Sequence, residues 1–272
     1  MPNAARITQI RRHGPVTRLT HWINVVAIFV LLKSGLQIFN AHPALYWGQD
    51  SHFATPWLSM FMRDLGERAI GVTQFANAEY DTTGLFGYSA RHGMMEPRGF
   101  PGWATLPSWR SLADGRVWHF AFAWLFVANG LVYLGAAILG GRLRRDLLPR
   151  RGELTAAHLK AEIRSHLRLR FPRAAGYNTL QKLTYLVVIL GLLPLMLATG
   201  LSMSPGMNAA APWLIELFGG RQSARSIHFI AAGGIVLFVI VHVAMVVAAG
   251  PWNHLRAMIT GRLAIEPEGE RP

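Results

Sequence analysis

The chain has 272 residues, of which 51% are hydrophobic and only 15% are charged. Soluble domains carry about 25% charged residues on average, so this composition excludes an ordinary soluble globular protein. The formal net charge is +13 and cysteine is absent, which excludes covalently attached c-type haem, cysteine-ligated iron–sulfur clusters, disulfides and thiol catalysis.

Four long apolar stretches explain the low charge content. The first contains one charged residue, Lys33, and is too long to be a signal peptide, so it is expected to remain as a membrane anchor. Each stretch is roughly 20 residues or longer, which at about 1.5 Å per residue crosses a hydrocarbon core of about 30 Å. We therefore expect one membrane domain over residues 1–272, an all-α four-helix transmembrane bundle with helices at 17–39, 117–141, 177–203 and 224–250.

Basic residues are concentrated at alternate ends of the predicted helices. Residues 1–20 hold four arginines and no acid, and residues 141–182 hold eleven lysines and arginines against three acids. By the positive-inside rule, both termini and the basic segment 142–176 are expected on the cytoplasmic side of a bacterial inner membrane. The positive charge is interpreted as contact with anionic lipid headgroups of the bilayer, and no nucleic-acid partner is expected.

Two of the segments between the predicted helices are long enough to fold. Residues 40–116 exceed the length of a simple connector and are predicted to form a folded periplasmic cap and docking surface. Within this outer segment, Phe53–Ile70 is predicted to form an amphipathic surface helix. On the inner side, Ala156–Leu169 is predicted to form a short basic amphipathic helix at the membrane surface.

Four of the eleven histidines lie within the predicted spans: His21, His119, His228 and His242. An imidazole in the hydrocarbon core is costly unless it is paired or ligated, so each is a candidate functional residue. His228 and His242 are 14 residues apart, which on a helix places them about 40° apart in azimuth and about 21 Å apart along the axis. One helix therefore offers one ligand near each side of the membrane.

The topology predicts the partners of these two histidines. His119 begins the second helix at the outer side and is expected to pair with His228. His21 begins the first helix at the inner side and is expected to pair with His242. Two imidazoles from different helices are typical of six-coordinate haem, whereas zinc and copper usually take three or four ligands at one level. The sequence thus predicts two haem b groups, with these four histidines as the iron ligands.

Further residues are candidates for contacts with the haems, among them Arg116, Arg221 and Arg225 on the outer side. Gly35 is 14 residues after His21, where a small residue would fit beside the outer macrocycle, although close helix packing explains such a glycine as well. Arg18 is a candidate partner for an anionic haem propionate, or an anchor at the membrane interface. Lys33 is interpreted as a partner of an outer propionate, with snorkelling toward the interface as the alternative.

The third predicted helix has no histidine, but it begins with a group of polar side chains. Asn178, Gln181 and Lys182 are expected at the cytoplasmic interface, near the level of the inner haem. They are candidates for hydrogen bonds to the carbonyl oxygens of a quinone. A polar and aromatic interfacial belt is the alternative, and the spacing alone leaves both open.

The chain resembles the four-helix di-haem cytochrome b subunits of membrane-bound oxidoreductases. These include the formate dehydrogenase gamma subunit, the nickel–iron hydrogenase b-type cytochrome and the thiosulfate reductase cytochrome b. The resemblance rests on the sequence TRLTHWIN at residues 17–24, on Ser34-Gly35, on His119 and on the 14-residue spacing of the last two histidines.

This resemblance implies electron exchange between a periplasmic oxidoreductase and the membrane quinone pool. It further implies a quinone pocket bordered by Asn178 and His242, although Leu180 stands where the formate dehydrogenase subunit has glycine. The outer segment, including NAHPALYWG at residues 40–48, looks like a subgroup that accompanies periplasmic molybdopterin oxidoreductases of the sulfite oxidase type.

The predicted function is therefore a di-haem b-type cytochrome subunit that carries electrons between a periplasmic partner and quinone. One alternative is a stand-alone haem b membrane enzyme, such as a quinone-coupled superoxide oxidase or a transmembrane reductase. Another is a transporter or structural anchor that uses the histidines as proton relays or helix contacts. Of the remaining histidines, His42 and His92 are the candidates for a partner interface.

Overall fold

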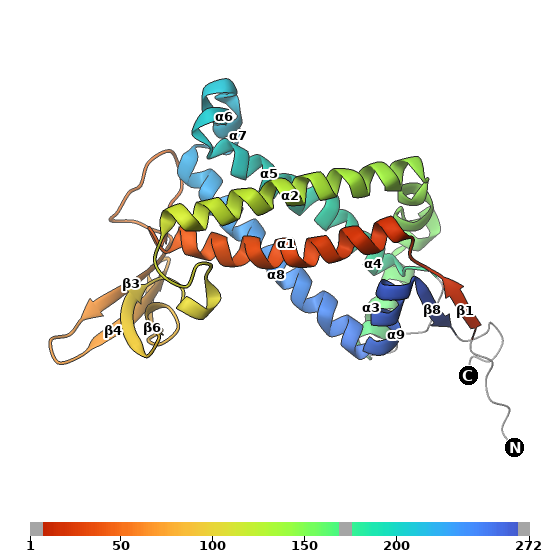
Figure 1. Cartoon of the computed structure of the whole chain (residues 1–272), viewed down its shortest axis with the longest axis horizontal. Coiled ribbons are helices and arrows are strands. Elements are labelled where there is room, and N and C mark those ends of the chain that lie inside the picture. The colour runs from red at the N-terminus through yellow and green to blue at the C-terminus, as the bar shows by residue number, and fades with distance from the viewer. Residues whose placement is uncertain (1–7, 169–175, 266–272) are drawn as a thin grey trace, which may run out of the picture. The chain divides into compact units, whose positions relative to one another are not determined.

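The computed structural model describes residues 8–168 and 176–265 of the chain. Among these residues, four helical stretches are long and apolar enough to cross a membrane (Figure 1). This number agrees with the four spans predicted from apolar length. They are α1 (Pro15–Phe39), α2 (Leu112–Leu139), the stretch Thr179–Ser202 and α8 (Arg221–Ala248).

The third stretch is not a uniform α-helix. It consists of α4 (Thr179–Leu186), the π-helical segment η4 (Val187–Leu192) and α5 (Leu193–Ser202). Pro194 lacks a backbone N–H and cannot donate to the carbonyl four residues earlier, which disturbs the α-helical ladder at this point. The wider helix of η4 accommodates that missing donor.

The chain forms two compact units, and each spanning stretch contributes residues to both. The first unit comprises Met1–Ile23, Asn129–Pro194 and Gly233–Pro272. The second comprises Asn24–Ala128 and Leu195–Ala232. The predicted inner histidines, His21 and His242, belong to the first unit, and the predicted outer histidines belong to the second.

The outer segment of the second unit is built largely of strands (Figure 1). The all-α expectation is therefore wrong for this part of the chain. The helix predicted over Phe53–Ile70 is also wrong, because these residues contain one strand and the start of the next. One antiparallel sheet has the order β2 (Ala44–Leu45), β3 (Leu58–Asp64), β4 (Ala69–Phe75), β5 (Ala78–Asp81), and a second pairs β6 (Gly87–Arg91) with β7 (Met94–Arg98).

Turn geometry explains why the predicted helix does not form. Gly66, in the loop between β3 and β4, has a φ of 83°, a left-handed value that an α-helix cannot contain. The two strands then pair along their whole length, from Leu58 opposite Phe75 to Asp64 opposite Ala69. The β6–β7 hairpin turns in the same way, since both residues of its turn, His92 and Gly93, have positive φ.

A small apolar core joins the outer segment to the helices of its unit. Buried Phe39 at the end of α1 packs with Leu45, Leu58 and Met60 of the sheet, and Phe229 of α8 lies against this cluster. Shorter elements complete the second unit: η1 (Gly102–Ala104), α6 (Pro205–Ala210) and α7 (Trp213–Leu217).

The first unit adds short elements around the spanning stretches. The predicted inner amphipathic helix is present as α3 (Ala156–Leu167), and position 169 of the prediction lies outside the described residues. Strand β1 (Thr8–Arg11) pairs with β8 (Arg262–Ile265), which directly follows α9 (Pro251–Thr260). Gly261 ends α9 with a φ of 84°, a left-handed C-cap that turns the chain into β8. The remaining elements are η2 (Leu143–Leu147) and η3 (Arg151–Leu154).

Candidate functional site

The outer pair of histidines lies within the second unit. His119 of α2 and His228 of α8 have ring centroids 6.3 Å apart and ring planes at 62°. A metal–imidazole nitrogen bond is about 2 Å long, so two imidazoles bound in line to one metal have centroids roughly 6 Å apart. The separation of the two rings therefore fits a single metal ion between them.

The inner pair repeats this arrangement within the first unit. His21 of α1 and His242 of α8 have ring centroids 6.4 Å apart and ring planes at 60°. The structure thus brings together both pairs that depth matching predicts from the sequence. Each pair draws its two rings from different helices, as axial coordination of one iron requires.

The rings of the outer pair are each held by a buried hydroxyl group. Oγ of Ser34 lies 3.1 Å from Nδ1 of His119, and Oγ1 of Thr199 lies 3.0 Å from Nδ1 of His228. Both hydroxyls also donate to a carbonyl of their own helix, at 2.7 Å from Val30 and 2.7 Å from Leu195.

These contacts determine the tautomer of each outer imidazole. A hydroxyl has one hydrogen, and the short bonds to the helix carbonyls use it. Nδ1 of each histidine must then be the protonated nitrogen that donates to the hydroxyl oxygen. In a neutral imidazole this leaves the lone pair of Nε2 available to a metal, which is how polar neighbours commonly orient histidine ligands.

A glycine follows each of these hydroxyl residues and lies beside the same imidazole. A Cβ atom at Gly35 would be 3.3 Å from Cε1 of His119, and one at Gly200 would be 3.4 Å from Cε1 of His228. Gly35 therefore makes room for the imidazole ring itself, rather than only for a macrocycle. Sequence reasoning missed Thr199-Gly200, although it repeats the small hydroxyl–glycine pattern of Ser34-Gly35 in another span.

The inner pair has aromatic neighbours instead. His242 stacks on Phe238 at a centroid distance of 5.8 Å, and Trp22 lies edge-on to His21 at 5.5 Å. Phe238 also contacts Tyr185 at 6.3 Å, and Tyr185 contacts Tyr177 at 5.5 Å. A continuous series of aromatic rings therefore leads from the inner histidine to the beginning of α4.

The predicted propionate partners have different environments. Nη1 of Arg18 donates to the carbonyl of Ile259 at 2.6 Å, while its buried Nε has no partner among the described residues. Lys33 donates to the carbonyl of Trp103 in the outer segment at 2.8 Å, which is a contact with protein backbone.

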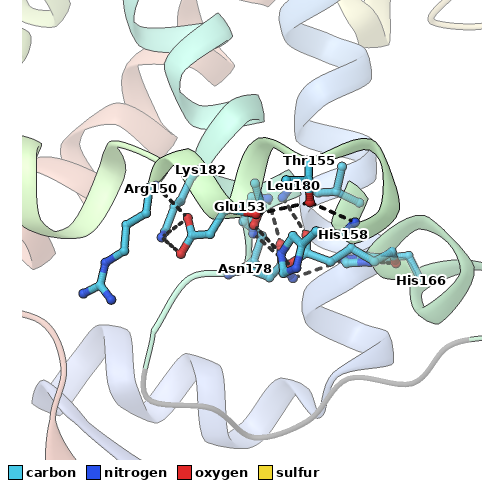
Figure 2. A network of polar contacts seen from close by, with 12 residues as sticks. Arg150, Glu153, Thr155, His158, His166, Asn178, Leu180 and Lys182 are labelled. Atoms are coloured by element: carbon cyan, nitrogen blue, oxygen red, sulfur yellow. Dashed lines mark hydrogen bonds and ion pairs between the residues drawn. The ribbon is translucent and has the colours of Figure 1, made fainter. Parts of the chain in front are cut away.

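The predicted quinone residues form a polar network at the beginning of α4, which Figure 2 shows. Asn178 is the N-cap of α4: its Oδ1 accepts from the backbone N–H of Gln181 at 2.8 Å, and Oε1 of Gln181 accepts from the backbone N–H of Asn178. Nδ2 of Asn178 donates to Nε2 of His166 in α3. Nζ of buried Lys182 donates to both carboxylate oxygens of Glu153, at 3.0 and 2.8 Å.

Two carboxylates stabilise this network. The hydrogen bond from the Lys182 ammonium lowers the pKa of Glu153. Burial of Glu162 would raise its pKa, but hydrogen bonds from the backbone N–H groups of Thr179 and Leu180 outweigh burial and lower it. Both acids therefore stay ionised at the positive N-terminal end of α4, where negative charge is favourable. The side chains of Asn178 and Lys182 are largely engaged in this structural network, whereas the Nε2 amide group of Gln181 has no hydrogen-bond acceptor among the residues that the structure describes.

The two histidine pairs fit haem better than a bare metal ion. No group of three or more His, Cys, Asp or Glu side chains able to hold a metal occurs within residues 8–168 and 176–265. A haem iron already has four porphyrin nitrogens and needs only two axial ligands, which each pair supplies. The glycines beside the outer imidazoles and the free Nε2 lone pairs agree with this donor set.

Comparisons with known proteins cover almost the whole chain. Residues 12–261 match a family model described as prokaryotic cytochrome b561. A protein of Azospira oryzae named "Putative protein-methionine-sulfoxide reductase subunit YedZ1" is 31% identical over 251 residues, which cover 92% of this chain and 96% of that protein. No solved structure is similar enough to match the chain.

The hydroxyl contacts predict a selective effect at the outer pair. We expect Ser34→Ala and Thr199→Val to weaken retention of the outer haem about 10-fold, because loss of a hydrogen bond to a ligating histidine typically has an effect of this size. The inner haem should be unchanged. Redox titration, with electron paramagnetic resonance to resolve the two ferric haem signals, measures the haem content of the outer and the inner site in one sample.

Thr184→Val is the matched control, because Thr184 donates to a carbonyl of its own helix in the same stretch as Thr199 and has no hydrogen bond to a histidine among the described residues. Equal changes at both haems, or no change at either, would contradict an orienting role for the two hydroxyls.

Proposed function

This chain belongs to the prokaryotic cytochrome b561 family of haem-binding membrane electron-transfer proteins, and from this premise we propose that it holds two haem b groups and conducts electrons across the bacterial inner membrane. The observation that carries the proposal is the presence of two imidazole pairs with ring separations of 6.3 and 6.4 Å. The distribution of basic residues supports cytoplasmic termini, so the pair of His21 and His242 serves the cytoplasmic side.

The residues of the chain have separate roles in this proposal. His119 and His228 would hold the outer haem, and Ser34 and Thr199 orient their rings. Arg18, one helical turn before His21, has a buried Nε without a partner among the described residues, so it can donate to an anionic group at this side. Bound haem b supplies reversible one-electron transfer at its iron.

The count of haems per chain tests the proposal directly. We expect pyridine haemochrome analysis of the purified protein to give two b haems per chain. His119→Ala and His21→Ala should each reduce this value to about one, because each removes one axial ligand of a different site. His52→Ala, at an exposed position of the outer segment, is the control and should retain both. Fewer than two b haems in the unmodified protein would refute the di-haem assignment.

We place the exchange of electrons with quinone at the cytoplasmic side, near the beginning of α4. The aromatic series from His242 through Phe238 to Tyr185 and Tyr177 supports this location, because it links the inner histidine to the polar network. Within that network, the amide of Gln181 is the available hydrogen-bond donor for a quinone carbonyl. Asn178 caps the backbone at the beginning of α4, and Lys182 neutralises the charge of Glu153.

Gln181→Glu separates the quinone role from the structural role. The glutamate keeps an acceptor oxygen in place of the amide Oε1 that completes the capping box with Asn178, so the fold should be retained. The amide donor is lost, and we expect the KM for a quinol to rise while the haem content and the melting temperature stay unchanged. Stopped-flow reduction of the haems by a water-soluble quinol measures the change. An unaltered KM would exclude Gln181 from the quinone site.

A periplasmic oxidoreductase is the proposed partner at the outer side. The Azospira oryzae relative is named as a subunit of a protein-methionine-sulfoxide reductase, and we propose a partner of the same class here, possessing a molybdopterin cofactor. Reduction of one methionine sulfoxide consumes two electrons and two protons and releases one water. Quinol oxidation supplies two electrons, which matches this demand. The folded outer segment, with His42 and His92, provides the proposed docking surface.

Reoxidation of the reduced haems tests the partner. We expect reduced protein to be reoxidised when both a periplasmic molybdopterin sulfoxide reductase from the same organism and a protein containing methionine sulfoxide are present. The same protein with unoxidised methionines is the control and should give no reoxidation. Absorbance of the reduced b haems follows the reaction. Equally fast reoxidation without the reductase would instead favour a self-contained membrane enzyme.

A further inference from the structure

A basic cavity lies within the first unit, where the two ends of the described chain meet. Strands β1 and β8, the beginning of α1 and the end of α9 surround it, and its volume is about 390 Å³. The ionisable side chains that line it are all basic: Arg11, His13, Arg18 and Arg262. None of the four paired histidines lines this cavity.

The strand pairing places two of these charges together. Arg11 lies directly opposite Arg262 in the antiparallel β1–β8 pair. Like charges directly opposite each other on two strands are destabilising unless something compensates them. Neither guanidinium has an acidic partner among the described residues. The register of this sheet therefore brings two positive charges together without an acidic partner in the part of the chain that the structure describes.

Two more groups at the cavity also indicate an excess of positive charge. The Nε of Arg18 is buried and has no hydrogen-bond acceptor among the described residues, although buried donors are normally satisfied. Burial, together with the positive charges of nearby residues such as Arg12 and Arg142, lowers the pKa of His13 to about 4. An anion in the cavity would accept from Arg18 and offset the charge that surrounds His13.

The two helices that border the cavity carry exposed apolar side chains, which indicate the kind of anion. On α9, Trp252, Leu255 and Ile259 follow one another at helical spacing and are 81%, 39% and 60% exposed. On α1, Leu19 is 64% exposed, and Nε1 of Trp22 donates to Met258 of α9 at 3.2 Å. A short helix with an exposed apolar stripe and a tryptophan is typical of the membrane interface. The basic cavity thus borders surfaces suited to acyl chains.

We propose that this cavity binds the phosphate headgroup of an anionic phospholipid, with the acyl chains along the exposed apolar sides of α1 and α9. The phosphate accepts hydrogen bonds from Arg18 and compensates the opposed charges of Arg11 and Arg262. A soluble phosphate would satisfy the same guanidinium groups but would leave the stripe of Trp252, Leu255 and Ile259 without a function. The lipid closes the junction between the two chain ends at the bilayer surface.

Native mass spectrometry of the purified haem-loaded protein, exchanged into micelles with equal amounts of phosphatidylglycerol and phosphatidylcholine, tests this site. We expect one phosphatidylglycerol to be retained preferentially. Arg11→Gln combined with Arg262→Gln should reduce that preference about 10-fold, because each basic residue contributes appreciably to anionic-lipid binding. Arg144→Gln combined with Arg164→Gln removes the same charge from two exposed positions outside the cavity and should leave the preference unchanged.

Three outcomes would overturn the proposal. One is equal retention of the two lipids by the unmodified protein, and another is an equal loss of preference in both double variants. The third is protection by inorganic phosphate alone, measured as an equal rise in melting temperature with and without phosphatidylglycerol, which would identify a soluble phosphate ligand. Haem content, measured in every sample, shows separately whether the histidine sites are filled, so the lipid site and the proposed electron transfer can fail independently.

Discussion

The cost of placing an imidazole in hydrocarbon is the constraint on which the rest of this molecule depends. Each of the four spanning histidines needs a polar or metal partner at its ring nitrogens, because the bilayer offers no water. In the outer pair, a hydroxyl that already bonds to its own helix satisfies Nδ1 and leaves Nε2 as the one unsatisfied nitrogen. Nε2 of each ring therefore needs a ligand between the two rings. An imidazole pair without a metal would carry an unfavourable free energy in the bilayer.

The two histidine pairs have different neighbouring residues that orient their rings. Ser34 and Thr199, both fully buried, fix the outer rings by hydrogen bonds and force a single tautomer. The inner rings of His21 and His242 lie against Trp22 and Phe238, which restrict their orientation by packing. The outer site therefore has a polar, directional support and the inner site an aromatic one. Aromatic support suits the inner side, because Phe238 also contacts Tyr185 in the predicted quinone region.

Features encoded by local periodicity could be predicted from the sequence, whereas features encoded by distant pairing could not. The four spans follow from apolar length, and the histidine pairs follow from the 14-residue spacing on one helix together with the alternation of charge. The strands of the outer segment depend on register between residues such as Leu58 and Phe75, which no local pattern specifies. Gly66 was the local signal against a helix there. The role of Thr199 was equally difficult to predict, because a hydroxyl in an apolar span becomes informative only once His228 is known to lie beside it.

The outer segment and the outer histidine pair are parts of one hydrogen-bonded framework, and this has a mechanical consequence. On α8, Arg225 donates to the carbonyls of His42 and Ala44, and Ser226 donates to the carbonyl of Tyr46 at 2.6 Å. These two residues come less than one helical turn before His228. A protein that binds the outer segment therefore acts on a rigid extension of the ligand-bearing helix, rather than on a flexible tether. Rigid attachment keeps the distance from a docked partner to the outer site constant, and electron transfer between proteins requires that constancy.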